Sequence, residues 1–289
     1  MRGLWKTLLG ALAAVAFAGS AAAEPPVWVV KDKDSEIVLF GSVHVLPPNM
    51  NWVPPVLDRA LKAADDIWFE LPVDPQSDAD AAALATQIGV LPPESSLFKL
   101  LNPADADLMT RVAATYGVST ALLDRLQPWL AEIALSGGTY RRNGADVSTG
   151  VEKTIAAMVS PKARRKAFET PAEQLALLSG GTLEEQIASL RETMHEMDEN
   201  PDEFQVLVKA WVDADIATLQ HEAIDPIRKS SPALFRRLVS DRNARWTEIL
   251  DSRLKGHGRT VVVVGIGHLI GPEGVPARLR ALGYSVTGP

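Results

Sequence analysis

The sequence contains no cysteine. Disulfide bonds, thiolate metal ligands, a cysteine nucleophile and a lipid anchor on cysteine are therefore excluded. Several common catalytic motifs are missing as well: there is no HExxH metalloprotease motif, no GxSxG serine elbow and no phosphate-binding P-loop. These absences leave histidines, carboxylates and arginines as the residues that could carry chemistry.

Basic residues are outnumbered by acidic ones. The chain has 29 Lys and Arg against 36 Asp and Glu, a formal net charge of −7, with no uninterrupted basic run longer than three residues. Without Arg2 and Lys6 in the first 23 residues, the charge is −9. Because neutralisation of phosphates supplies most of the affinity for nucleic acids, this composition excludes a nucleic-acid partner.

Long hydrophobic runs are also scarce. The one near the N-terminus, Leu8–Ala18, follows two basic residues and precedes the small residues Ala21–Ala23. It is too short to span a bilayer comfortably, and the pattern is typical of a secretory signal peptide. We therefore predict a signal peptide over residues 1–23, cleaved near Ala23, and a periplasmic or secreted mature domain over 24–289. The alternative is an uncleaved anchor, and no later segment is apolar enough to span a membrane.

Strand-like segments gather near the two ends of the sequence, and a mostly helical pattern runs between them. The expected strands are residues 27–30, 37–40, 67–70, 166–170, 261–264 and 284–286. Apolar strands of this kind must be covered on both faces, so the terminal segments should join in one sheet. We predict an α/β fold with a mixed central sheet built from N- and C-terminal βαβ pieces. A large, mainly helical insertion is expected at about 77–254.

Two histidines share the same local frame. Gly41-Ser-Val-His44 follows one apolar run, and Gly265-Ile-Gly-His268 follows another. A side chain at the carboxyl end of a buried strand points to the place where open α/β sheets bind ligands. Two imidazoles that converge there with carboxylates make a divalent-metal site. Alternatively, both histidines cap their strands and bond to backbone groups.

Carboxylates stand at the ends of two further expected strands, Glu70 and Glu169. We expect His44, Glu70 and His268 to hold a divalent metal, Mn²⁺, Co²⁺ or Zn²⁺, which would activate a water. Glu169 would then take the proton as general base. Otherwise, Glu70 is a surface residue at a strand end and Glu169 simply precedes a helix N-cap.

Two more residues are candidates for catalysis. Glu152, in Gly150-Val-Glu152, either enters the site or decorates a helix N-terminus, where its charge is favourable. Arg242, in Asp241-Arg-Asn243, would stabilise an anionic oxygen in the transition state. Alternatively, Arg242 lies on a solvated helix face and has no role in catalysis.

The order of these motifs resembles that of the TraB/GumN family. The similar segments are Gly41–His44, Phe69–Glu70, Gly150–Glu152, Phe168–Gln174, Asp241–Asn243 and Gly265–Gly271, followed by a similar C-terminus up to Val286. The resemblance spans essentially the whole predicted mature chain. It implies an α/β core with a helical insertion, shared with Tiki metalloproteases and more distantly with erythromycin-esterase-like and ChaN-like proteins.

In the Tiki branch, paired GxxH motifs and a glutamate are associated with metal-dependent peptide cleavage. The resemblance therefore implies the GxxH roles for His44 and His268 and the early glutamate role for Glu70. Further polar positions of the family pattern are matched by Glu152, Glu169 and Arg242. Ser42 stands where threonine is commoner. No C-terminal anchor like that of Tiki proteins is present, so their substrates are not implied.

We accordingly expect a periplasmic metal-dependent hydrolase, of the peptidase type, that acts on a peptide or small-molecule substrate. The rival expectation is a non-catalytic periplasmic protein that binds a peptide, a signal molecule or a haem-like ligand through the same histidines. A third is a structural partner in an envelope assembly, for which His44 and His268 would lie far apart. The sequence sets neither the substrate nor the oligomeric state.

Overall fold

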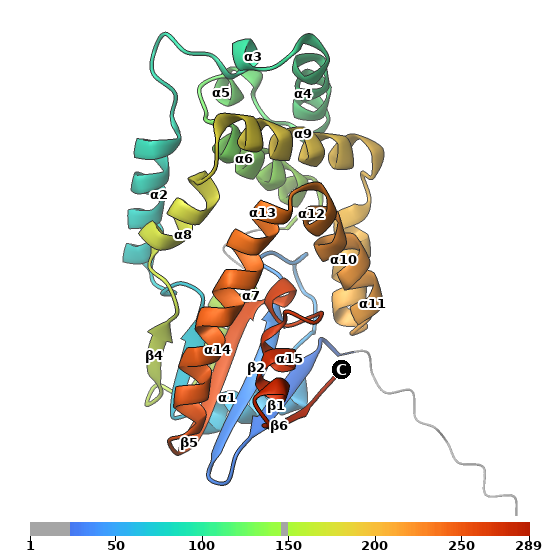
Figure 1. Cartoon of the computed structure of the whole chain (residues 1–289). Coiled ribbons are helices and arrows are strands. Elements are labelled where there is room, and N and C mark those ends of the chain that lie inside the picture. The colour runs from blue at the N-terminus through green and yellow to red at the C-terminus, as the bar shows by residue number, and fades with distance from the viewer. Residues whose placement is uncertain (1–23, 146–149) are drawn as a thin grey trace, which may run out of the picture.

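A computed structural model describes residues 24–145 and 150–289, so the predicted signal peptide lies outside the described residues. The chain forms a six-stranded mixed sheet with helices around and beyond it (Figure 1). The strands are β1 (Val27–Lys31), β2 (Ser35–Ser42), β3 (Asp66–Phe69), β4 (Arg164–Ala167), β5 (Gly258–Gly265) and β6 (Ser285–Thr287). The α/β fold expected from the sequence is confirmed.

The strand order is β4-β3-β5-β2-β1-β6. The first four of these strands run parallel, whereas β1 pairs antiparallel with both β2 and β6. Consecutive strands of the expected βαβ pieces are not neighbours, because β5 from the C-terminal part lies between β2 and β3. The two ends of the chain are therefore interleaved within one sheet.

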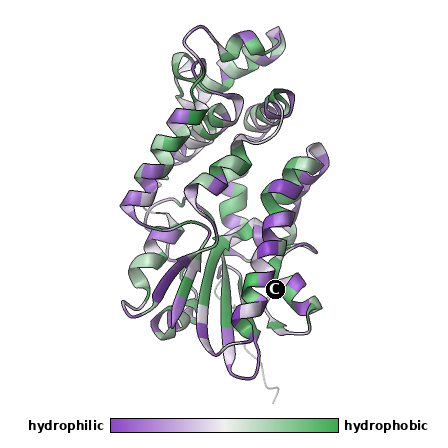
Figure 2. Ribbon diagram, turned by 60° about the vertical axis from the view of Figure 1, so that its left-hand side comes forward, coloured by the Kyte–Doolittle hydropathy of each residue, from purple (hydrophilic) through white to green (hydrophobic). Residues whose placement is uncertain are grey.

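The middle strands are hydrophobic because both of their faces are covered (Figure 2). The register pairs Gly41 with Val264 and Ser42 with Gly265, so both GxxH motifs leave the sheet at the same edge. Gly41 allows a close approach there: a Cβ on it would meet Cδ1 of Ile266 and lie 3.1 Å from its Cα, so Ile266 would have to shift. By contrast, β4 is short and polar, as an edge strand should be.

Helices cover the sheet and build a separate body above it (Figure 1). Those before β4 are α1 (Pro55–Ala63), α2 (Pro75–Gly89), α3 (Leu97–Leu100), α4 (Pro103–Tyr116), α5 (Thr120–Leu123), α6 (Pro128–Arg142) and α7 (Val151–Met158). Those after it are α8 (Pro171–Ser179), α9 (Leu183–Glu199), α10 (Glu203–Val212), α11 (Ile216–Leu219), α12 (Asp225–Ser230), α13 (Pro232–Phe235), α14 (Asp241–Leu254) and α15 (Val275–Ala281). None of the helices in the described ranges is long and apolar enough to cross a membrane.

Two hydrophobic cores hold the molecule together. One surrounds the sheet, with α1 against β2 and β5 on one face and α14 and α15 on the other. The second lies among α3 to α6 and α9 and includes Leu97, Leu108, Met109, Val112, Leu123, Leu135 and Leu190. The helical body thus has apolar packing of its own and does not only cover the sheet.

Trp211 of α10 connects the inserted helices to the sheet. Its ring packs against Phe40 and Trp52, with ring centroids 6.0 Å and 5.6 Å away. Its buried Nε1–H donates a 2.7 Å hydrogen bond to the carbonyl of Gly41. Because Gly41 begins the first GxxH motif, this bond fixes the backbone from which His44 departs.

We expect the substitution Trp211→Phe to lower the free energy of unfolding by about 2–3 kcal/mol, because it shrinks a buried ring and leaves a buried carbonyl unpaired. Urea unfolding measures the change. Leu122→Ala serves as the control, since Leu122 is 51% exposed, and should cost less than about 0.5 kcal/mol. Equal effects of the two substitutions would contradict the anchoring role of Trp211.

Candidate functional site

The candidate residues gather at the carboxyl edge of the parallel strands. Glu70 directly follows β3, and Glu169 lies just beyond β4. The backbone N–H of Glu169 donates to the carbonyl of Glu70 at 3.0 Å. This bond holds the segments that follow β3 and β4 side by side beyond the sheet. His44 and His268 follow β2 and β5 at the same edge.

Arg242 of α14 lies at the centre of this group. Its Nε donates to Oε1 of Glu169 at 2.8 Å, and its Nη2 donates to Oε2 of Glu169 at 2.8 Å and to Oε2 of Glu70 at 2.6 Å. Its Nη1 donates to the carbonyl of Leu238 at 3.0 Å and to Nε2 of His268 at 2.9 Å. A guanidinium has five N–H donors, so every one of them is engaged.

The alternative that Arg242 lies on a solvated helix face is therefore wrong, since the residue is only 5% exposed. Burial alone lowers the pKa of Arg242, but its bonds to Glu169 and the charges of Glu70 and Glu169 raise it overall. The guanidinium also lies over the ring of Trp246, 4.7 Å from its centroid. To contact a substrate oxyanion, as the sequence suggested, Arg242 would first have to exchange one of its five bonds.

His268 is held in one tautomer. Its Nδ1 is 2.6 Å from Oδ1 of Asn243, whose Nδ2 donates to the carbonyl of Glu273 at 2.9 Å. Since Arg242 can only donate, Nε2 of His268 is an acceptor and the proton sits on Nδ1. Burial lowers the pKa of His268 to about 4, which keeps the ring neutral at physiological pH.

Glu70 is held as a carboxylate. Its Oε1 accepts the backbone N–H of Gly265 at 2.6 Å, while Oε2 is bonded to Arg242. Burial by itself raises the pKa of Glu70. The charges of His268 (once that ring is protonated, below about pH 4), Arg242 and His44 outweigh burial and lower the pKa to about 2. Oε1 also lies 3.8 Å from Nε2 of His268. His44 lines the same cavity as Glu70.

Glu169 is both a residue of the site and the residue before a helix N-cap, the two interpretations that the sequence offered. It precedes Thr170, which caps α8 in a capping box, and its own side chain turns into the site with the residue 7% exposed. Both carboxylate oxygens accept from Arg242, and Arg245 approaches Oε1 at 3.4 Å. Because both of its oxygens are bonded to Arg242, the geometry favours a structural role for Glu169.

His44 and Glu152 form a second group at the mouth of the site. Oε1 of Glu152 accepts the hydroxyl of Ser42 at 2.6 Å and lies 3.3 Å from Nδ1 of His44. This hydrogen bond raises the pKa of His44, although its side chain is 69% exposed and water screens part of the attraction. Burial raises the pKa of Glu152, but His44 and Ser42 outweigh it and lower the pKa overall.

Three residues with a place in the site had no assigned role from the sequence. Asn243 orients His268, Ser42 holds Glu152, and Nε2 of Gln174 donates to Oε2 of Glu70 at 3.3 Å. All three stand inside motifs already identified in the sequence: Gly41–His44, Phe168–Gln174 and Asp241–Asn243. Their position within those motifs was the signal that could have identified them as site residues.

The donor chemistry of the site fits a divalent metal ion. Metal-bound histidines usually donate their second ring N–H to an oxygen, and both histidines here have Nδ1 beside such an oxygen, from Glu152 and Asn243. Ligands of one ion, at about 2.0–2.2 Å each, lie about 3–4 Å apart, which is the spacing of His268 Nε2 and Glu70 Oε1. Within residues 24–145 and 150–289, however, no three such side chains lie close enough together to enclose an ion.

A cavity of about 240 Å³ opens beside this edge. His44, Glu70, Glu152 and Gln174 line it together with residues from α2 and the loop after β3. Water and a small part of a substrate can therefore reach Glu70 and Glu152, whereas Arg242 lies behind them.

We expect His268 to remain neutral in the metal-free protein down to about pH 5, since burial lowers its pKa to about 4. Its proton should sit on Nδ1. Nitrogen NMR of the imidazole rings measures both properties. A ring that titrates near its ordinary pKa of about 6.5, or that carries its proton on Nε2, would contradict the bonding described for Arg242 and Asn243.

We expect Arg242→Gln to cost about 3–5 kcal/mol of stability, because it leaves two buried carboxylates without their cation. Adding Glu169→Gln to that variant should restore part of the loss, since it removes one of the stranded charges. Arg245→Gln is the control, because the side chain of Arg245 is 53% exposed and exposed pairs are worth about 0–1 kcal/mol. Urea unfolding of the four proteins decides; a loss no larger than the control's would refute the central role of Arg242.

Comparison with known proteins bears on the same residues. A family model described as the TraB/PrgY/gumN family matches residues 26–288 and so includes all the motifs that converge here. Neither a curated protein nor a solved structure matches this chain. From the extent of that match, the chain belongs to the TraB/PrgY/gumN family.

Proposed function

We propose that this protein is a periplasmic metal-dependent hydrolase, of the peptidase type, with its active site at the carboxyl edge of the sheet. His44, Glu70 and His268 would hold Mn²⁺, Co²⁺ or Zn²⁺. The observation that carries the proposal is the orientation of the two histidines. Each has its Nδ1 beside an oxygen, which leaves Nε2 as the ligand atom.

A bound divalent ion would polarise the scissile carbonyl and make a nearby water more acidic. The residues of the chain prepare for this in several ways. Arg242 keeps Glu70 ionised, and Asn243 keeps the lone pair of His268 on Nε2. An ion at His268 would take the place of its hydrogen bond from Arg242, which would free one N–H for a substrate oxygen.

Glu152 is better placed than Glu169 to move the proton. Among the residues that the structure describes, the two side-chain hydrogen bonds of Glu152 both fall on Oε1, and its carboxylate lines the 240 Å³ cavity. Its lowered pKa keeps it ionised at neutral pH. Oε2 of Glu152 would accept a proton from the attacking water and return it to the leaving amine. Glu169 would instead position Arg242.

Non-catalytic binding is the second candidate. It is supported by a larger cavity of about 450 Å³, mostly apolar in its lining, which reaches His44 from the helical body. Wide apolar pockets with a few polar groups are typical of ligand-binding proteins. In that case the imidazole of His44 would contact the ligand itself. Substitution of His44 would weaken ligand binding, and neither the wild type nor the variant would turn over a substrate.

The test is metal analysis of protein purified without chelator, followed by cleavage assays on a peptide library. We expect about one ion per chain, and we expect His44→Ala and His268→Ala to lose both the ion and the cleavage. Asn243→Ala should weaken metal binding or activity about 10–100-fold, as outer-shell partners of metal ligands do.

His257→Ala is the control, because His257 lies in an exposed turn before β5 and should bind the ion as the wild type does. Wild-type protein that takes up no Mn²⁺, Co²⁺ or Zn²⁺ and cleaves no peptide would refute the hydrolase. Ligand binding without turnover would support the second candidate.

A further inference from the structure

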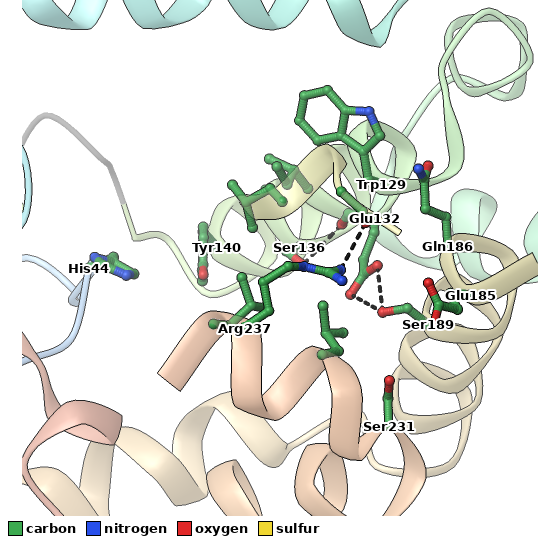
Figure 3. A pocket seen from close by; sticks show the side chains of 16 residues that line it. His44, Trp129, Glu132, Ser136, Tyr140, Glu185, Gln186, Ser189, Ser231 and Arg237 are labelled. Carbon is green, nitrogen blue, oxygen red and sulfur yellow. Dashed lines mark hydrogen bonds between the residues drawn. The ribbon is translucent and has the colours of Figure 1, made fainter. Parts of the chain in front are cut away.

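The 450 Å³ cavity lies between α6, α9 and the π-helical turn Arg236–Ser240, and His44 stands at one of its ends (Figure 3). Its apolar lining comes from Trp129, Ile133, Tyr140, Leu178, Leu234 and Leu238. A ligand in this cavity would therefore lie against apolar walls and reach the mouth of the candidate active site.

Glu132 of α6 brings a carboxylate into this apolar cavity (Figure 3). Its described partners are hydroxyls rather than cations: Ser189 donates to Oε2 at 3.0 Å and Thr193 donates to Oε1 at 2.9 Å. Burial raises its pKa, although both hydroxyls act in the opposite direction. Glu132 is partly buried, and a carboxylate withdrawn from water without a cation costs free energy, so its presence here favours a ligand with a positive charge.

The surroundings of Glu132 are strongly acidic. Glu132 also lines an adjoining cavity of about 870 Å³, together with Glu184, Glu185, Glu192, Glu196, Glu203 and Glu222. Arg191 in this lining is already bonded to Asp105, at 2.7 Å. Burial and the charges of Glu203, Glu192 and Glu132 raise the pKa of Glu196 to about 7. The negative potential of these carboxylates attracts cations and repels anions.

Two other polar residues line the 450 Å³ cavity, Arg237 and Gln186, and neither of them forms an ion pair with Glu132 among the described residues. Arg237 is held at the wall, where its guanidinium donates to the carbonyls of Leu177 and Gly180 at 2.9 Å and 2.8 Å. Gln186 has a buried Oε1 without a hydrogen-bond partner among the described residues. An unpaired buried acceptor is costly, and a donor on a ligand would satisfy it.

We propose that this cavity is a subsite for a lysine or arginine side chain of a peptide substrate. The aliphatic stem would pack on Trp129 and Leu234, and the cationic head would pair with Glu132. An acidic side chain would be repelled, and an apolar one would cover Glu132 without supplying a counter-charge. His44 at the end of the cavity would bring the peptide backbone to the metal edge, a step that rests on the proposed hydrolase function.

Fluorescence anisotropy of labelled Ala/Gly peptides with one central lysine, arginine, norleucine or glutamate tests the proposal directly. The full chain should bind the lysine and arginine peptides at least about tenfold more tightly than the norleucine peptide, because a buried ion pair is formed. Glu132→Gln should abolish this preference. Its melting temperature should not fall, since the substitution keeps the shape and removes an uncompensated buried charge.

Glu248→Gln is the matched control, because it removes the same charge from an exposed position on α14; it should keep the preference. Equal affinity for lysine and norleucine peptides, or no binding of any peptide, would overturn the subsite. A preference that depends on Glu132 without peptide cleavage would support the subsite and refute the hydrolase. Cleavage with no basic preference would do the reverse.

Discussion

The arrangement of the site depends on one buried cation, the guanidinium of Arg242. It lies between the carboxylates of Glu70 and Glu169 and donates to His268. Burying so many ionisable groups is favourable only when their bonds are well satisfied, and here all five donors of the guanidinium are used. These bonds join the ends of β3, β4 and β5 to α14, so segments far apart in sequence share a single electrostatic centre.

The same centre sets the protonation of its neighbours. Glu70 stays ionised beside the guanidinium, and His268 stays neutral because it accepts from Arg242 and donates to Asn243. A neutral imidazole with a lone pair on Nε2 is the state that a metal ion requires, and here that lone pair accepts from Arg242. Arg242 is therefore both the structural centre of the metal-free site and a competitor for the place that an ion would take.

The strands and the edge at which they end could be predicted from the sequence, because a short apolar run that stops at a glycine or a proline is a local signal. His44, Glu70 and His268 follow from that edge alone. The position of Arg242 could not be derived in this way: it stands within a helix, and the face that a helix buries depends on its tertiary neighbours. For the same reason, the cavity around Glu132 left no signal in the sequence, since its walls come from helices that meet only in the folded chain.

The most direct test of this account is an X-ray structure of crystals soaked in Mn²⁺, with anomalous differences measured near the manganese edge. The account predicts one strong peak in bonding contact with His268 and Glu70, with Arg242 withdrawn from Nε2 and still bound to Glu169. Crystals saturated with Mn²⁺ that show no peak there, with Arg242 still bonded to His268, would contradict it.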